Sequence, residues 1–314
     1  MSYSAARIQT TLHEESAQTR AGMNQIRTPV EIHSPAAEYT SRYFDTRFDP
    51  SYGTYWAMLR ADAPVCFSPP LVASLRECQR EIATRVREAI SNDAAERIHF
   101  QVFGSRIPDV FSLGGDLILF KSLIERRDRA ALLRYARETI DLVYSTATGY
   151  ELPVTTISLV QGQALGGGFE CALAAQVVIA ERQSRMGLPE VLFNLFPGMG
   201  AYQLLCRRMT PVRAEQFILS GRTYTAEELY EMGLVDVLAD PGQGEEAVQH
   251  YIRMHHRHQR AANSLRRAIQ ASAPLDYQAM LRIGEVWVDA ALQLTPKDFQ
   301  VLDYLIRAQQ QYLQ

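Results

Sequence analysis

A β-branched, apolar run over residues 153–160 constrains the fold most, because it leads into three consecutive glycines, Gly166 to Gly168. A short helical pattern over 169–175 and a second apolar run over 177–180 follow at once. Apolar runs of this length without polar alternation are typical of strands buried on both faces. Because parallel neighbours require a crossover connection, this order predicts an α/β fold with a largely parallel sheet.

The same pattern organises most of the chain. The other expected elements are strands over 52–59 and 98–103 and helices over 71–90, 129–144 and 210–237. We expect a mobile N-terminal extension over 1–42, an α/β core over 43–244 and a C-terminal helical region over 245–314. The extension is predicted because residues 1–42 lack a sustained apolar period.

Composition excludes several classes of protein. The chain has 314 residues, 47% of them hydrophobic, and a net charge of -3, which gives no electrostatic footprint for nucleic acid. No apolar run is long enough to span a bilayer and no signal core precedes residue 35, so we expect a cytoplasmic protein. The four cysteines are far apart, which favours reduced thiols. No metal or other cofactor is expected, because the tract His255-His-Arg-His258 lacks companion ligands and fits a solvated helix face better.

Two glycine loops, Gly114-Gly115 and Gly166-Gly167-Gly168, each lie between a predicted strand and a predicted helix. This placement leaves backbone N–H groups free at the positive end of a helix dipole. Two such donors that converge on one oxygen would form an oxyanion hole. Phosphate is the competing ligand, but neither loop has nucleotide-binding spacing. Close packing of helix on sheet is the structural alternative for each glycine alone.

Two carboxylates accompany the loops. Glu170 closes the second loop, and Glu190 follows in Gly187-Leu-Pro-Glu190. A pair of carboxylates can move protons at neutral pH, because one holds a proton while the other has lost it. Two ordinary surface acids are the alternative interpretation. The coincidence of both acids with both glycine loops favours the catalytic one.

Over residues 103–240 the chain resembles the crotonase (enoyl-CoA hydratase/isomerase) superfamily. The residues that carry the resemblance are Gly114-Gly-Asp116, Gln161-Gly-Gln-Ala-Leu-Gly-Gly-Gly-Phe-Glu170, Gly187-Leu-Pro-Glu190, Pro197-Gly-Met-Gly200, Leu219-Ser-Gly-Arg222 and Gly233-Leu-Val235. The resemblance implies a crotonase-like spiral of ββα turns with a C-terminal helical region that helps to form trimers or hexamers. It also implies catalytic roles for Glu170 and Glu190 and oxyanion-hole roles for Gly115 and Gly167. Gly115 stands where many hydratases have Ala, which leaves a backbone N–H contribution intact.

Within this superfamily the chain is most similar to bacterial diffusible signal factor synthases, which make cis-2-unsaturated fatty acids. Val110-Phe-Ser-Leu-Gly-Gly-Asp-Leu117 and Glu285-Val-Trp-Val-Asp289 are among the matching segments. The likeness implies dehydration of a 3-hydroxyacyl thioester on acyl carrier protein, followed by thioester hydrolysis to the free acid. An acyl chain requires an apolar tunnel, for which the candidates are Trp287, Met199, Leu281 and Leu292.

Two other functions remain open at this point. A general enoyl-CoA hydratase/isomerase of fatty acid metabolism would prefer CoA thioesters and lack thioesterase activity. The resemblance also permits a binding partner of a signalling sensor protein, with secondary catalysis. An intact acid pair argues against a purely structural role.

Overall fold

The structure is a computed structural model that describes residues 41–94 and 97–313. These residues lie within one compact unit, Ala37–Gln314. The extension expected over 1–42 lies outside the described residues except for its last two positions, so it stays a prediction.

Among the described residues, the larger of two sheets has six strands in the order β1-β2-β3-β5-β7-β10. In this sheet β1 and β2 pair antiparallel, and the other neighbours, β2-β3, β3-β5, β5-β7 and β7-β10, are parallel. This confirms the largely parallel sheet. Its strands are β1 (Phe44–Asp49), β2 (Thr54–Leu59), β3 (Phe100–Ser105), β5 (Thr155–Val160), β7 (Val177–Glu181) and β10 (Val237–Ala239).

A smaller sheet has the strand order β4-β6-β8-β9, and two of its strands lead into the glycine loops. Each of β3, β5 and β7 is followed directly by one of these short strands and then by helical turns, which confirms the expected spiral of ββα turns. The short strands are β4 (Val110–Ser112), β6 (Gln163–Leu165), β8 (Arg185–Gly187) and β9 (Thr223–Thr225). Both glycine loops therefore begin where a strand of the smaller sheet ends.

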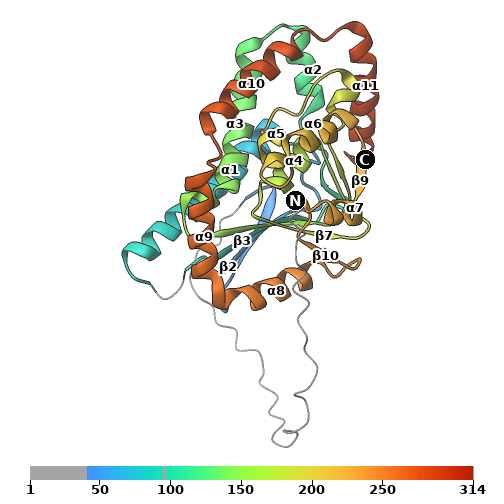
Figure 1. The fold of residues 1–314 in the computed structure, drawn as a ribbon. Coiled ribbons are helices and arrows are strands. Elements are labelled where there is room, and N and C mark those ends of the chain that lie inside the picture. Colours follow the sequence, from blue (N-terminus) through green and yellow to red (C-terminus); the bar gives the residue numbers. More distant parts are fainter. Residues whose placement is uncertain (1–40, 95–96, 314) are drawn as a thin grey trace, which may run out of the picture. The chain divides into compact units, whose positions relative to one another are not determined.

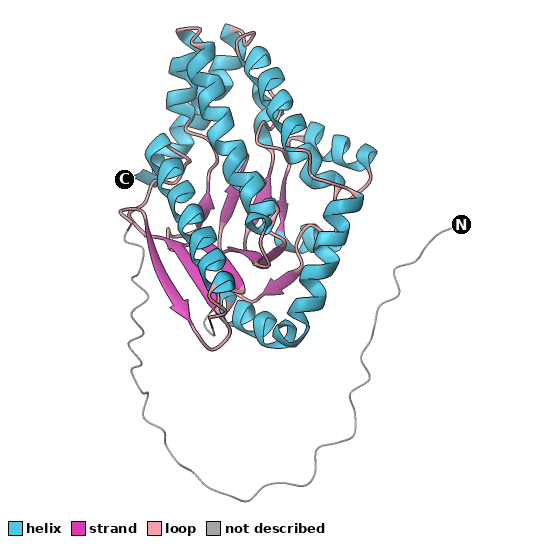
Figure 2. Cartoon of the chain, turned by 90° about the vertical axis from the view of Figure 1, so that its left-hand side faces the viewer, coloured by secondary structure: helices cyan, strands magenta, loops and turns pink. Residues whose placement is uncertain are grey.

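Helices cover both faces of the larger sheet (Figures 1 and 2). On β2, Trp56 and Met58 face a cluster with Val248 and Ile252 of α8 (Gly244–His255), while Tyr55 faces the main core. Side chains of a strand alternate between faces, so a strand buried on both sides is apolar throughout. The main core lies under α1 (Pro69–Ser91), α3 (Arg129–Ala147) and α4 (Gly167–Ala174).

The last two α-helices of the described chain lie at the same end of the fold as α2 (Leu117–Glu125), whereas α8 lies against the larger sheet (Figure 1). After α9 (Gln259–Ser272), α10 (Tyr277–Ala291) packs against α3 and α11 (Pro296–Gln310) packs against α2. Together they enclose a third apolar cluster, which includes Phe120, Val288 and Leu302. Within residues 41–94 and 97–313, no helix has both the length and the apolar character needed to cross a bilayer.

The helix expected over 210–237 is wrong in part. Gly221, with φ of +60°, ends α6 (Pro211–Ser220), and β9 follows. Thr225 then starts α7 (Ala226–Glu231) with a capping box, in which Thr225 and Glu228 each bond the other's backbone N–H. A left-handed glycine stops a helix, and a capping box starts a new one.

Candidate active site

The first glycine loop follows β4. Gly114 has φ of +86°, and a Cβ there would lie 2.6 Å from the Leu165 carbonyl oxygen, so only glycine fits. Asp116 then caps α2 by accepting a hydrogen bond from Leu119 N at 3.0 Å. Gly115 is thus held between a tight turn and a helix N-terminus.

The second glycine loop follows β6 and starts α4. Gly166, with φ of +54°, accepts hydrogen bonds at its carbonyl from the N–H groups of Phe169 and Glu170. A Cβ on Gly168 would lie 2.2 Å from the Ser112 carbonyl oxygen, so β4 and α4 approach too closely for any side chain. The glycines therefore bring the two loops together.

Gly115 and Gly167 line the same pocket. The Gly115 nitrogen is 3.6 Å from the point that a Cβ on Gly167 would occupy. Among the described residues, neither of these two N–H groups donates a hydrogen bond. The pair is available to a ligand oxygen, with the N-terminus of α4 adding its dipole.

Glu170 lies on the first turns of α4 and is 1% exposed. Its Oε1 accepts hydrogen bonds from Met199 N at 2.8 Å and Ala201 N at 2.9 Å. Burial raises the pKa of Glu170 to about 7, against the opposing effect of these N–H donors, which stabilise the carboxylate.

Glu190 lies in the 3₁₀ turn η2 (Pro189–Phe193), and its carboxyl group packs on Gly166, where a Cβ would be 2.7 Å from Oε1. Its Oε2 is buried and has no hydrogen-bond partner among the described residues. Burial, and then the charge of Glu170, raise the pKa of Glu190 to about 8. The two acids are thus electrostatically coupled in one pocket.

The pocket encloses about 550 Å³, including its open mouth. Both predicted acids, both predicted glycines, Met199 and Trp287 line it. The other lining residues are Leu117, Phe120, Tyr135, Ala136, Thr139, Phe193, Leu195 and Gly198.

The structure does not bring the other two predicted substrate-binding residues, Leu281 and Leu292, into the lining of this pocket. Leu281 packs against the main core and Leu292 against the third cluster. Leu281 and Trp287 are six positions apart on α10, which places them on different sides of the helix, and Leu292 is its C-cap. Trp287 of α10 does line the pocket, where its ring packs against Phe120 with centroids 5.0 Å apart.

Two residues near the first loop had no signal in the sequence. The buried Tyr135 hydroxyl donates to Phe67 O at 2.7 Å and accepts from Asp116 N at 3.2 Å. Gln309 of α11 donates to Leu113 O at 2.9 Å and Gly115 O at 3.0 Å. In the sequence, Tyr135 fits the apolar face of a helix, and Gln309 lies 194 positions from Gly115. The contact of either residue with the first loop could therefore not be predicted from the sequence.

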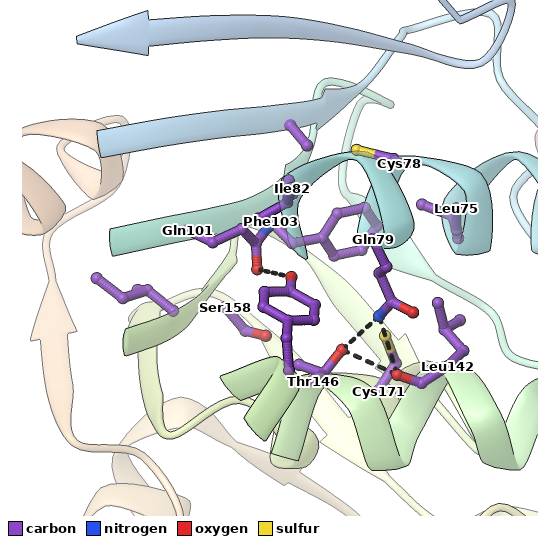
Figure 3. A pocket seen from close by; sticks show the side chains of 13 residues that line it. Leu75, Cys78, Gln79, Ile82, Gln101, Phe103, Leu142, Thr146, Ser158 and Cys171 are labelled. Atoms are coloured by element: carbon purple, nitrogen blue, oxygen red, sulfur yellow. Dashed lines mark hydrogen bonds between the residues drawn. The ribbon is translucent and has the colours of Figure 1, made fainter. Parts of the chain in front are cut away.

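A second cavity of about 460 Å³ lies under α1, between β3, β5, α3 and α4 (Figure 3). Its polar side chains bond to one another: Gln79 donates to Thr146 at 2.9 Å, and Tyr150 donates to Gln101 at 3.1 Å. Burial raises the pKa of Cys78 and Cys171 to about 12, so these thiols stay protonated at neutral pH. With no carboxylate in its lining, this cavity is a weaker candidate for acid–base chemistry.

The histidine tract lies at the end of α8. His255 and His258 are exposed, whereas His256 is half-buried and its ring packs edge-on against Tyr52 at 5.3 Å. Within the part of the chain that the structure describes, no group of three or more His, Cys, Asp or Glu side chains is arranged to hold a metal ion.

The enoyl-CoA hydratase/isomerase family model matches residues 79–288. Among curated proteins, Bacillus subtilis YngF, described as an enoyl-CoA hydratase/isomerase, is 37% identical over 132 residues, which are 42% of this chain and 48% of YngF. EchA17 of Mycobacterium bovis, described as an enoyl-CoA hydratase, is 29% identical over 174 residues, 55% of this chain and 62% of EchA17. The matches thus span about half to three fifths of these relatives.

Solved structures share the fold. The enoyl-CoA hydratase from Bacillus halodurans superposes with a TM-score of 0.69 at 21% identity, over 83% of this chain and 99% of the other. Pseudomonas aeruginosa DspI superposes with a TM-score of 0.59 at 24% identity, over 82% and 98%. At such identities the likeness establishes the crotonase fold alone.

Proposed function

The chain belongs to the enoyl-CoA hydratase/isomerase family, and we propose that it removes water from, or adds water to, C2 and C3 of an acyl thioester. The observation that carries this proposal is the convergence in one pocket of two acids, the buried Glu170 and the half-buried Glu190, with the free N–H groups of Gly115 and Gly167. Acids move the protons, and N–H donors stabilise the enolate that forms between the two steps.

In the proposed dehydration, Glu190 removes the C2 proton and the thioester oxygen becomes an enolate oxygen held by Gly115 and Gly167. The enolate then expels the C3 hydroxyl, which leaves as water with a proton from Glu170. Addition of water runs backwards, with Glu170 taking a proton from water and Glu190 giving one to C2. The N–H groups that donate to Glu170 favour its carboxylate form, so the proton that the pair shares lies on Glu190 in the free protein. This is the protonation state that addition of water requires.

We further propose that the substrate is a 3-hydroxyacyl group on acyl carrier protein and that the product is a free cis-2-unsaturated fatty acid. In the second step water attacks the thioester carbonyl carbon, the C–S bond breaks, and the carrier thiol leaves with a proton. The same N–H pair would hold the oxyanion of this adduct. The segments shared with diffusible signal factor synthases and the apolar walls at Trp287 and Met199 support this choice.

To test this proposal, the purified full chain is incubated with 3-hydroxyacyl groups on acyl carrier protein and, separately, on CoA. The products are analysed by mass spectrometry. Free cis-2-enoic acid from the carrier-protein substrate is expected. Glu170→Gln and Glu190→Gln should each lower the rate by about 10²–10⁴-fold, while the matched variant Glu181→Gln, a buried acid outside the pocket, keeps it. Reversible hydration of trans-2-enoyl-CoA without release of acid would instead establish a general hydratase, the alternative that the relatives' descriptions favour.

The proposed function includes the assembly and location of the protein. We propose a homo-oligomer, a trimer or hexamer, that acts in the cytoplasm and binds a regulatory sensor protein. Light scattering after size-exclusion chromatography measures the oligomeric state, and a monomer would contradict it.

A further inference from the structure

The C-terminal helix α11 reaches the oxyanion loop through one side chain. The Gln309 amide nitrogen donates to both Leu113 O and Gly115 O, at 2.9 and 3.0 Å, and the residue is 8% exposed. We propose that Gln309 is a positioning residue for catalysis, which fixes the Gly115 N–H in the direction of the thioester oxygen. This inference rests on the proposed function, because it assigns that N–H to an oxyanion.

The peptide groups around the Gly115 N–H are each tied down. Gly114 O accepts from Phe67 N at 2.7 Å, and Asp116 N donates to the Tyr135 hydroxyl. Gln309 holds the carbonyls on either side of the Gly114–Gly115 peptide. Two adjacent glycines rotate freely, so this peptide has little conformational preference of its own. Its direction depends on the bonds that hold it.

Helix α11 is itself anchored to the elements that carry both loops. Lys121 of α2 pairs with Asp303 at 2.5 Å and lies 5.9 Å from the centre of the Phe299 ring. At the other side, the Gln163 amide on β6 bonds the Tyr312 hydroxyl. Because β6 leads into Gly166 and Gly167, the C-terminal segment braces both strands from which the N–H donors arise.

Two variants separate hydrogen bonding from packing. Gln309→Met keeps the volume and removes the donors, and Gln309→Glu keeps the shape but turns an acceptor toward two carbonyls. Gln310→Met is the matched control, since Gln310 is the next residue and is exposed. We expect Gln309→Met to lower kcat about 10-fold with little change in KM, since removing an oxyanion donor outright costs about 10²–10³-fold. Gln309→Glu should lower kcat at least as much, and Gln310→Met should match the wild type.

Hydrogen exchange followed by mass spectrometry provides a readout that is independent of turnover. Peptides covering 110–119 should exchange faster in Gln309→Met than in the wild type and the control, while peptides of β5 and β7 should not change. Unchanged exchange at 110–119, or kcat within twofold of the wild type, would overturn the positioning role. A fall in kcat accompanied by a loss of folding stability, with exchange raised throughout the chain, would show that Gln309 only packs. If the wild type turns over no acyl thioester, the proposed function fails, and the exchange result still reports whether Gln309 holds the loop.

Discussion

Glu170 and Glu190 face one pocket from different surroundings. Two backbone N–H groups hold the Glu170 carboxylate, whereas Glu190 Oε2 is buried without a partner in the described part of the chain. Hydrogen bonds to a carboxylate favour its charged form, and burial without them favours the neutral form. The pair therefore holds one proton near neutral pH, preferentially on Glu190.

The activity should depend on pH as a narrow bell. With apparent pKa values of about 7 and about 8 belonging to the pair, both acids are protonated below the lower value and no base remains. Above the higher value both are ionised and no proton can be delivered. We expect kcat/KM for an enoyl thioester to peak between these limits. A flat profile from pH 5 to 9 would contradict the shared proton.

The free energy of unfolding should depend on pH in a direction that the burial of the Glu190 carboxyl group determines. The folded pKa of Glu190 lies above its ordinary value of 4.5, so its contribution to the free energy of unfolding is intact below pH 4.5 and is lost as pH rises towards 8. Glu190→Gln removes this loss, and should stabilise the protein by roughly 2–4 kcal/mol more at pH 8.5 than at pH 4.5. Urea unfolding at both pH values measures the difference. An equal effect at both would show that Glu190 is ionised without cost.

At the scale of elements, the sequence predicts what depends on local pattern. The long apolar strands and the periodic helices α1 and α3 are where they were expected, because each carries its own period. The three-residue strands of the smaller sheet carry no period and went unpredicted. Motif residues located both acids and both glycines, whereas Tyr135 and Gln309 reach the first loop only through tertiary packing. Helix periodicity alone did not show which α10 side chains face the pocket.

The contact between the 197–200 loop and α10 limits the pocket. A Cβ on Gly198 would lie 2.6 Å from two ring carbons of Trp287. Gly198→Ala must therefore displace the indole ring or the loop, at a cost of about 1–3 kcal/mol. We expect the ratio of kcat/KM for long over short acyl chains to fall, because the ring lines the pocket. Rates for acyl chains of four and twelve carbons measure this ratio, and an unchanged ratio would place the acyl chain elsewhere.

At the scale of the molecule, part of the candidate site is built on an apolar cluster separate from the main core. The third apolar cluster joins α2, α3, η2, α10 and α11, and so includes the elements on which Glu190, Trp287 and Gln309 lie. The cluster behind α8 belongs to the opposite face of the larger sheet. This division predicts that the helices beside the candidate site can loosen while the sheet stays intact, as sub-global openings do in other domains.

Leu302→Ala tests this separation. Leu302 is fully buried in the third cluster, so truncation should cost about 2–5 kcal/mol. We expect hydrogen exchange to accelerate in α2, α10, α11 and the 110–119 segment, with activity reduced, while β3, β5 and β7 stay protected. Leu265→Ala is the matched control, because Leu265 of α9 is 62% exposed and its truncation should change neither exchange nor rate. Uniform acceleration across the sheet in Leu302→Ala would mean that the described chain opens as one cooperative unit, and that the C-terminal helices cannot loosen independently of the core.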